Sequence, residues 1–196
     1  MSSPLRIGLI GVGNWALAGH VPALTRAGAT VHGIASRDPA RAAENAAKLA
    51  APIAAADWRE LIAHPDVDAL VVTTPPWAHV APVTAAIEAG KPVLCESPLA
   101  PTAAEARKLA DLARERGVIT GYTRPRPFNF NGRALCDAVQ SGAIGTLRRA
   151  SFELSGHPWL KAPLDKAWIV RTDSGPNPLA GLTIGLLGLR IASTLA

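Results

Sequence analysis

Between Leu5 and Tyr122, short apolar runs alternate with longer stretches whose apolar residues recur at helical spacing. Continuous apolar runs of this kind are typical of strands buried on both faces of a parallel sheet. Six strands are expected, at LRIGLIG, TVHGIAS, the stretch around Ile53, DALVVTT, KPVLCE and VITGY. Helices are expected between them, over residues 15–27, 38–50, from 57 onward, 78–89 and 102–117. Such regular alternation predicts an α/β fold with a doubly wound parallel sheet.

Local signals mark several of these helix ends. Asp38 followed by Pro39 is typical of an N-cap and the first helical position. Gly90 suits a left-handed C-cap after the fourth helix. Thr102 and Glu105 have the spacing of a capping box. The capping residues therefore fall where the hydrophobic pattern changes from one element to the next.

The pattern changes after Tyr122, and we place a domain boundary there, between residues 1–122 and 123–196. A proline-rich connection, TRPRPFNFN, is followed by a predicted helix over 132–145 and a predicted strand at Leu147–Leu154. These elements are too few to enclose a core by themselves. We expect an incomplete α+β second domain.

The stretch GVGNWA lies between the first strand and the first helix. Gly11 would permit a tight turn, and Gly13 would let the backbone approach a pyrophosphate. Ala16, in the third position, is small enough for close helix-to-strand packing. The amides of Asn14 and Trp15 at the helix start would face the anion. The motif predicts a dinucleotide site, although glycine turns also occur for structural reasons alone.

The end of the second strand bears on the choice of dinucleotide. Ser36 and Arg37 occupy it, with Arg41 one helical turn further on. Guanidinium groups pair well with a ribose 2′-phosphate, which favours NADP over NAD as the cofactor. The alternative is that both arginines are ordinary helix-end charges. Asp38 keeps NAD as a second choice.

Four stretches together resemble the Gfo/Idh/MocA oxidoreductases: IGLIGVGNWA, ASRDPARA, DALVVTTPPWAHVAPVTAAIEAGKPVLCESPLA and GAIGTLRRASFE. The resemblance extends over most of residues 5–155. It implies a Rossmann domain that binds NADP(H) or NAD(H), and a second domain with an open sheet that often mediates oligomerisation. It implies an enzyme that oxidises or reduces a sugar, a polyol or a similar small molecule. The cofactor contacts it implies are Gly11, Gly13, Asn14, Trp15, Ser36, Arg37, Thr74, Pro75, His79, Glu96 and the neighbouring Ser97. For His79 the alternative is a helix-start residue that satisfies nearby backbone groups.

The departures from the family pattern concern catalysis. The family places a lysine in its Glu-Lys-Pro motif, where this chain has Ser97 in CESPLA. The family's Asp and His, four residues apart, match Gly181 and Gly185 here. Neither serine nor glycine can replace an amine or an imidazole in proton transfer at neutral pH. We therefore assign no catalytic residue and keep two hypotheses: an oxidoreductase of this family, and an inactive nicotinamide-nucleotide sensor or partner subunit.

Composition adds limits to these hypotheses. Of 196 residues, 48% are hydrophobic and 18% are charged, which is a globular composition. The net charge of +5 arises in residues 101–196, but the basic residues are scattered, so no nucleic-acid partner is expected. Two distant cysteines, with no metal-binding spacing, suit a reducing cytoplasmic compartment.

The apolar segment 178–196 is interrupted by Arg190 and three glycines. We interpret it as a buried or interface helix rather than a membrane span. The incomplete second domain would leave a sheet edge open, which predicts a homo-oligomer or a partner subunit. The alternative is that the chain from about Gly175 onward derives from a truncated or frameshifted gene.

Overall fold

The computed structural model describes residues 3–123, 130–146 and 148–149. The chain divides into two compact units, Met1–Thr123 and Arg124–Ala196. The first unit holds the predicted sheet, and the second holds one described helix.

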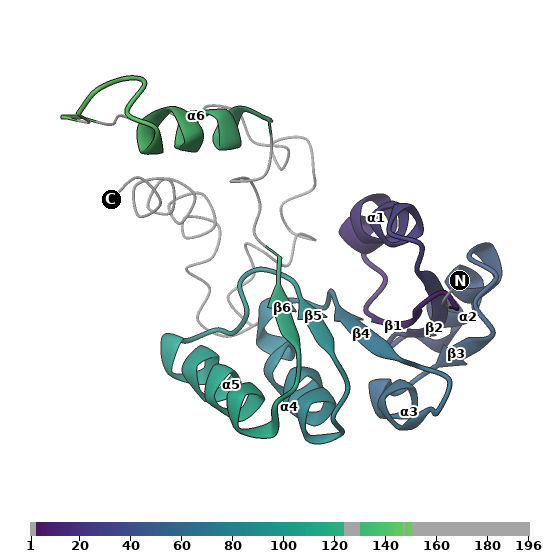
Figure 1. Cartoon of the computed structure of the whole chain (residues 1–196). Coiled ribbons are helices and arrows are strands. Elements are labelled where there is room, and N and C mark those ends of the chain that lie inside the picture. The colour runs from purple at the N-terminus through teal and green to yellow at the C-terminus, as the bar shows by residue number, and fades with distance from the viewer. Residues whose placement is uncertain (1–2, 124–129, 147, 150–196) are drawn as a thin grey trace, which may run out of the picture. The chain divides into compact units, whose positions relative to one another are not determined.

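The first unit is built on a six-stranded sheet in which every pairing is parallel (Figure 1). The strand order is β3-β2-β1-β4-β5-β6, which changes direction between β1 and β4. This confirms the predicted doubly wound sheet, including the weakly predicted third strand. The strands are β1 (Arg6–Ile10), β2 (Thr30–Ala35), β3 (Ile53–Ala55), β4 (Ala69–Val72), β5 (Val93–Cys95) and β6 (Thr120–Tyr122).

Four helices follow where the sequence predicted them: α2 (Pro39–Lys48), α3 (Trp58–Ala63), α4 (Val80–Glu88) and α5 (Ala103–Arg116). Three of these, α2, α4 and α5, begin or end at a predicted cap. Asp38 accepts hydrogen bonds from the first amides of α2, and Thr102 forms the predicted capping box with Glu105. Gly90 has φ +72°, the left-handed conformation expected of a cap. A short 3₁₀ turn, η2 (Pro76–Ala78), precedes α4.

The first connection differs from the single helix predicted over 15–27. It consists of a π-helical turn, η1 (Ala16–His20), followed by α1 (Val21–Arg26). Pro22 explains the difference, because proline has no amide hydrogen and its ring would crowd the carbonyl four residues earlier. The widened turn accommodates that ring, and the amide of Val21 donates to the carbonyl of Ala16.

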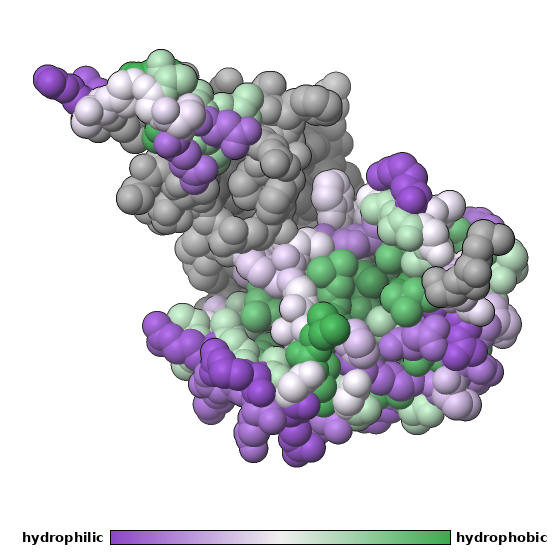
Figure 2. Space-filling view, viewed as in Figure 1, coloured by the Kyte–Doolittle hydropathy of each residue, from purple (hydrophilic) through white to green (hydrophobic). Residues whose placement is uncertain are grey.

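Alternate residues of the central strands enter two separate cores. In β1, Ile7 and Leu9 pack with α2 on one face, whereas Ile10 belongs to the core beneath α3, α4 and α5 on the other. In Figure 1, α3, α4 and α5 lie below the strands and α1 lies above them. Figure 2 shows hydrophilic residues over α5 and hydrophobic residues toward the middle of the unit, where the strands lie. The two covered faces explain why the strands are continuous apolar runs.

Two paired glycines make room for α3 on the sheet. Gly8 of β1 lies opposite Gly33 of β2, and the fully buried side chain of Leu61 packs over both. A Cβ atom on Gly33 would lie 2.6 Å from Cδ2 of Leu61 and 3.3 Å from Cβ of Ile53. These glycines are therefore required by packing and not by the backbone conformation.

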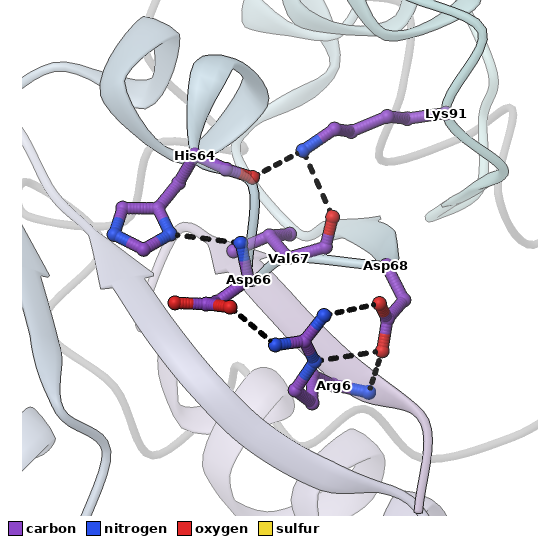
Figure 3. A network of polar contacts seen from close by, with 6 residues as sticks. All are labelled: Arg6, His64, Asp66, Val67, Asp68 and Lys91. Carbon is purple, nitrogen blue, oxygen red and sulfur yellow. Dashed lines mark hydrogen bonds and ion pairs between the residues drawn. The ribbon is translucent and has the colours of Figure 1, made fainter. Parts of the chain in front are cut away.

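A polar network joins the loops at the amino ends of β1, β4 and β5 (Figure 3). The Arg6 guanidinium lies 2.6 Å from an oxygen of Asp66 and 2.8 Å from one of Asp68. Hydrogen bonds from the Arg6 side chain and amide lower the pKa of Asp68 to about 2. Nearby, Lys91 donates to the carbonyl oxygens of His64 and Val67, at 2.6 and 2.8 Å. This network fixes the edge of the sheet that lies opposite the carboxyl ends of the strands.

The second unit contains α6 (Phe130–Gln140), which overlaps the helix predicted over 132–145 but ends earlier. Gly142 and Gly145 both have positive φ, so the chain turns where the sequence pattern continued the helix. Arg148 and Arg149 are not in a strand, and the remainder of the strand predicted at Leu147–Leu154 lies outside the described residues. The apolar segment 178–196 lies outside them as well. None of the described helices is long and apolar enough to cross a membrane.

The packing of Leu61 on Gly33 gives a stability prediction. Gly33→Ala should lower the free energy of unfolding by roughly 1–3 kcal/mol, because overpacking a filled core has this cost. The matched control is Gly19→Ala, where the new Cβ would meet only the Trp15 ring at 3.6 Å or more, an ordinary contact. Urea unfolding of both variants measures the difference. Equal stability of the two variants would contradict this account of the glycine pair.

Candidate functional site

The predicted site residues all follow the carboxyl ends of β1, β2, β4 or β5. In doubly wound sheets, ligands bind at this edge, in the crevice where the strand order reverses. Here the order reverses between β1 and β4. The loops after β1, β2, β4 and β5 each carry some of the predicted site residues. The residues are Gly11, Gly13, Asn14, Trp15, Ser36, Arg37, Arg41, Thr74, Pro75, His79, Glu96 and Ser97.

Gly11 makes a turn that no other residue could adopt without strain. Its φ is +95°, and a Cβ atom there would lie 2.9 Å from the amide nitrogen of Thr74. The Thr73 hydroxyl donates to the carbonyl oxygen of Gly11 at 2.7 Å. The turn after β1 is thereby pressed against the chain leaving β4.

Gly13, unlike Gly11, has open space beside it, because a Cβ atom there would meet nothing within 4 Å. Its carbonyl accepts the first helical hydrogen bond, from the amide of Leu17 at 3.2 Å. The amides of Asn14 and Trp15 precede that bond and so have no carbonyl of the helix to donate to. Both residues are exposed. A pyrophosphate group requires open space beside amides that have no partner within the helix.

The chain after β2 carries the residues predicted to bind a ribose phosphate. Asp38 caps the start of α2, because its Oδ1 atom accepts hydrogen bonds from the amides of Ala40 and Arg41 at 3.0 and 3.2 Å. The side chains of Arg37 and Arg41 are exposed. Ser36 accepts a hydrogen bond from the amide of Asp38 at 3.3 Å. This end of the sheet therefore presents two exposed guanidinium groups beside the Asp38 carboxylate.

His79 joins the loop after β4 to the loop after β5. Its Nε2 atom lies 2.6 Å from the carbonyl oxygen of Thr74, and its Nδ1 atom lies 2.9 Å from that of Pro98. The ring is fully buried. Burial lowers the pKa of the His79 imidazole and outweighs the two carbonyls, which raise it. In the neutral form only one ring nitrogen carries a proton, so one carbonyl at a time receives a hydrogen bond.

Glu96 lies at the centre of a second cluster, directly after β5. Its Oε1 atom accepts from the indole of Trp15 at 2.8 Å and lies 2.6 Å from Nε2 of His20. Its Oε2 atom accepts from the amide of Ser97 at 2.9 Å. Burial raises the pKa of the Glu96 carboxyl, but the hydrogen bonds it accepts, first among them that from His20, outweigh burial and lower the pKa to about 2.

The remaining predicted residues lie in the same two loops. The Thr74 hydroxyl donates to the carbonyl of Ala78 at 3.2 Å, and Pro75 precedes the turn η2. The Ser97 amide also donates to the Thr123 hydroxyl at 3.2 Å. Gly181 and Gly185, which match the family's Asp and His, lie outside the described residues.

Three residues of these clusters were not predicted from the sequence: His20, Thr73 and Thr123. Each acts through a partner far away in the chain, such as Glu96 for His20 and Gly11 for Thr73. The imidazole of His20 inside an otherwise apolar helical stretch was the one signal available. The two threonines follow strands and have no distinguishing pattern.

The fold and the site are together those of a dinucleotide-binding domain. A family model described as "Oxidoreductase family, NAD-binding Rossmann fold" matches residues 5–123. The chain belongs to this family, which confirms the resemblance inferred from its motifs.

Individual relatives agree with the family. The chain is 37% identical over 151 residues to the dTDP-3,4-didehydro-2,6-dideoxy-alpha-D-glucose 3-reductase of Saccharopolyspora spinosa, covering 76% of this chain and 45% of the relative. It is 38% identical over 147 residues to inositol 2-dehydrogenase 1 of Saccharopolyspora erythraea, covering 72% and 43%.

Two solved structures are also similar. The NAD binding oxidoreductase from Klebsiella pneumoniae has a TM-score of 0.67 at 36% identity, over 72% of this chain and 40% of that one. KijD10, a 3-ketoreductase from Actinomadura kijaniata in complex with NADP, has a TM-score of 0.65 at 32% identity, over 74% and 46%. The chain thus spans somewhat less than half the length of these relatives.

The burial of His79 predicts a loss of stability at acid pH. In the unfolded chain His79 takes up a proton near its ordinary pKa of 6.5, whereas burial lowers that pKa in the folded chain. The unfolded state then binds more protons below pH 6.5, so the free energy of unfolding falls as the pH is lowered through this range. His79→Asn should reduce this pH dependence and cost about 1–3 kcal/mol at neutral pH by leaving buried carbonyls unpaired.

Urea unfolding at pH 7.5 and 5.0 measures both effects. His64→Asn, a change of the same kind at the opposite edge of the sheet, is the control. A His79→Asn variant with the full pH dependence of the wild type would show that the buried His79 imidazole does not cause the loss of stability at acid pH.

Proposed function

We propose that this protein binds NADP(H), with NAD(H) as the weaker alternative. We further propose that it acts as an oxidoreductase on a sugar, a polyol or a similar small molecule. The observation that carries the proposal is the open space at Gly13 beside the amides of Asn14 and Trp15, which precede the first helical hydrogen bond. A helix start of this kind stabilises a diphosphate through its amides and the helix dipole.

The preference for NADP rests on charge at the end of β2. Asp38 uses its Oδ1 atom to cap α2, where it accepts from two amides. A 2′-phosphate requires donors, and the exposed guanidinium groups of Arg37 and Arg41 can supply them. The similar 3-ketoreductase KijD10 was solved with NADP, which agrees with this choice.

The proposed substrate class is supported by the relatives, which include a dTDP-sugar 3-reductase and an inositol 2-dehydrogenase. A bound nicotinamide supplies or accepts the hydride, and the protein provides orientation and proton transfer. His79 and Glu96 fix the loops after β4 and β5 that would border the nicotinamide. Ser97 stands in the second of these loops, where the family has a lysine.

Ser97 also favours a second candidate, a nucleotide-binding sensor or partner subunit without turnover. A serine hydroxyl cannot supply the positive charge or the acid/base chemistry of a lysine amine at neutral pH. The two candidates share the cofactor site and differ only in whether a substrate reacts there.

The cofactor assignment predicts an unequal effect of Arg37→Glu. NADPH affinity should fall about 100-fold, because a hydrogen-bonded charge pair is lost and replaced by repulsion. NADH affinity should change less than about 3-fold, because the 2′-hydroxyl does not need the guanidinium. Fluorescence titration of the full chain measures both dissociation constants, with Arg107→Glu on the exposed face of α5 as the control for net charge. Equal losses for the two nucleotides would remove the NADP assignment, and no binding of either by the wild type would remove the proposed function.

The role of residue 97 predicts a gain of activity. Ser97→Lys should raise kcat over a panel of sugars and polyols by about 100-fold, since a positioned acid/base commonly contributes that much. Ser97→Met supplies similar length without the charge and should give no gain. NADPH oxidation followed by absorbance measures turnover. If wild type and Ser97→Lys both bind NADPH and neither turns over, the sensor is the better description.

A further inference from the structure

Trp15 combines a high exposure with a fixed side chain. The residue follows the open glycine turn and is 66% exposed. Its indole N–H nevertheless donates to Oε1 of Glu96 at 2.8 Å, which fixes the direction of the ring. Because the ring is already held, a ligand that packs on it costs little further side-chain entropy.

Gly19 shows which face of the indole is open. A Cβ atom on Gly19 would lie 3.6, 3.8 and 3.9 Å from three neighbouring ring atoms, Cε2, Cδ2 and Cζ2 of Trp15. A point at such similar distances from bonded atoms lies over the face of the ring and not beyond its edge. One face of the indole therefore lies against the turn η1 at Gly19, and the opposite face is left for a ligand.

The anchor of the indole places this open face in the nicotinamide half of the proposed site. A dinucleotide lies across the crevice between the two halves of a doubly wound sheet. Its ribose phosphate is assigned to the chain after β2 and its pyrophosphate to Gly13, so its nicotinamide extends toward β4 and β5. Glu96, which holds the indole, directly follows β5. The ring thus extends from the pyrophosphate turn toward the loop that would border the nicotinamide.

The electronic character of the ring distinguishes the two forms of the cofactor. The nicotinamide of NADP⁺ carries a positive charge, whereas that of NADPH is neutral. The face of an aromatic ring is negative, and the indole attracts a cation more strongly than the other aromatic side chains do. Burial raises the pKa of Glu96, but the hydrogen bonds it accepts outweigh burial and lower it to about 2, so the indole N–H donates to a carboxylate at neutral pH. This hydrogen bond polarises the ring in the same direction.

We propose that the open face of Trp15 stacks on the nicotinamide ring and stabilises the oxidised, positively charged form of the cofactor more than the reduced form. This rests on the proposed binding of NADP(H). The resemblance to the family implies a cofactor contact at Trp15, but it specifies neither the part of the cofactor nor its redox state. The contact shifts the occupancy of the site toward NADP⁺, so a sensor of this kind would respond to the oxidised fraction of the nucleotide pool.

Calorimetric titration of the full chain with NADP⁺ and with NADPH tests the proposal. Trp15→Leu removes the aromatic face, so NADP⁺ affinity should fall about 10-fold, as for a partly desolvated cation–π contact. NADPH affinity should fall less than about 3-fold, because only stacking is lost. Trp15→Phe keeps a weaker aromatic face and should change the ratio of the two dissociation constants less than Trp15→Leu does. Ile119→Ala, which removes an exposed apolar side chain at the opposite edge of the sheet, is the matched control and should change neither constant.

A spectroscopic signature separates stacking from support of the turn. An indole stacked on an oxidised nicotinamide gives a weak charge-transfer absorption at longer wavelengths than either ring alone. The wild type saturated with NADP⁺ should show this band, Ile119→Ala should keep it and Trp15→Phe should lose it. The measurement remains available if Trp15→Leu does not fold. A wild-type complex without the band would contradict the stacking.

The remaining outcomes also decide the matter. If Trp15→Leu weakens NADP⁺ and NADPH by the same factor, or weakens neither, Trp15 does not recognise the charge of the nicotinamide and the proposal is wrong. Adenosine 2′,5′-bisphosphate lacks the nicotinamide and should bind the wild type and Trp15→Leu equally. A parallel loss of this ligand would mean general damage to the fold, which also overturns the proposal. If the wild type binds no form of NADP or NAD, the proposed function fails first and this inference falls with it.

Discussion

The contact between the Gly11 turn and the chain after β4 is the constraint on which the site depends. Gly11 has φ +95° and no space for a side chain, so the exit of β1 lies directly against Thr73 and Thr74. Because β1 and β4 are the strands between which the sheet changes direction, this contact lies at the place where doubly wound sheets bind their ligands. It leaves the next glycine, Gly13, facing open space. One glycine is thus required by contact with the protein, whereas the other leaves room for a ligand.

The loops at this edge of the sheet are held by side chains that bond to main-chain groups. His79 lies between the carbonyls of Thr74 and Pro98, and Glu96 accepts from the amide of Ser97. The opposite edge is fixed in the same manner, since Lys91 donates to two carbonyls there. Contacts of this kind satisfy buried main-chain groups that have no partner in a strand or helix. Both edges of the sheet are therefore ordered by polar side chains, although its interior is apolar.

The sequence predicted what is decided locally, and it missed what depends on distant partners. Apolar runs, caps such as Thr102, and the glycine turn are determined within a few residues, so the strands, most helix limits and the predicted site edge agree with the structure. The π-helical turn was missed because the pattern of apolar residues continues through Pro22. His20 and Glu96 lie 76 positions apart, and only the fold brings them together. In the second half of the chain, α6 ends before its predicted limit because glycines at 142 and 145 turn the backbone.

The loop that carries Ser97 is fixed through its backbone and not through the side chain at that position. The amide of Ser97 and the carbonyl of Pro98 are the groups that Glu96, Thr123 and His79 contact. The position of this loop therefore does not depend on the chemistry of the side chain at position 97. A lysine, a serine or another residue can stand at position 97 without changing the contacts that hold this loop.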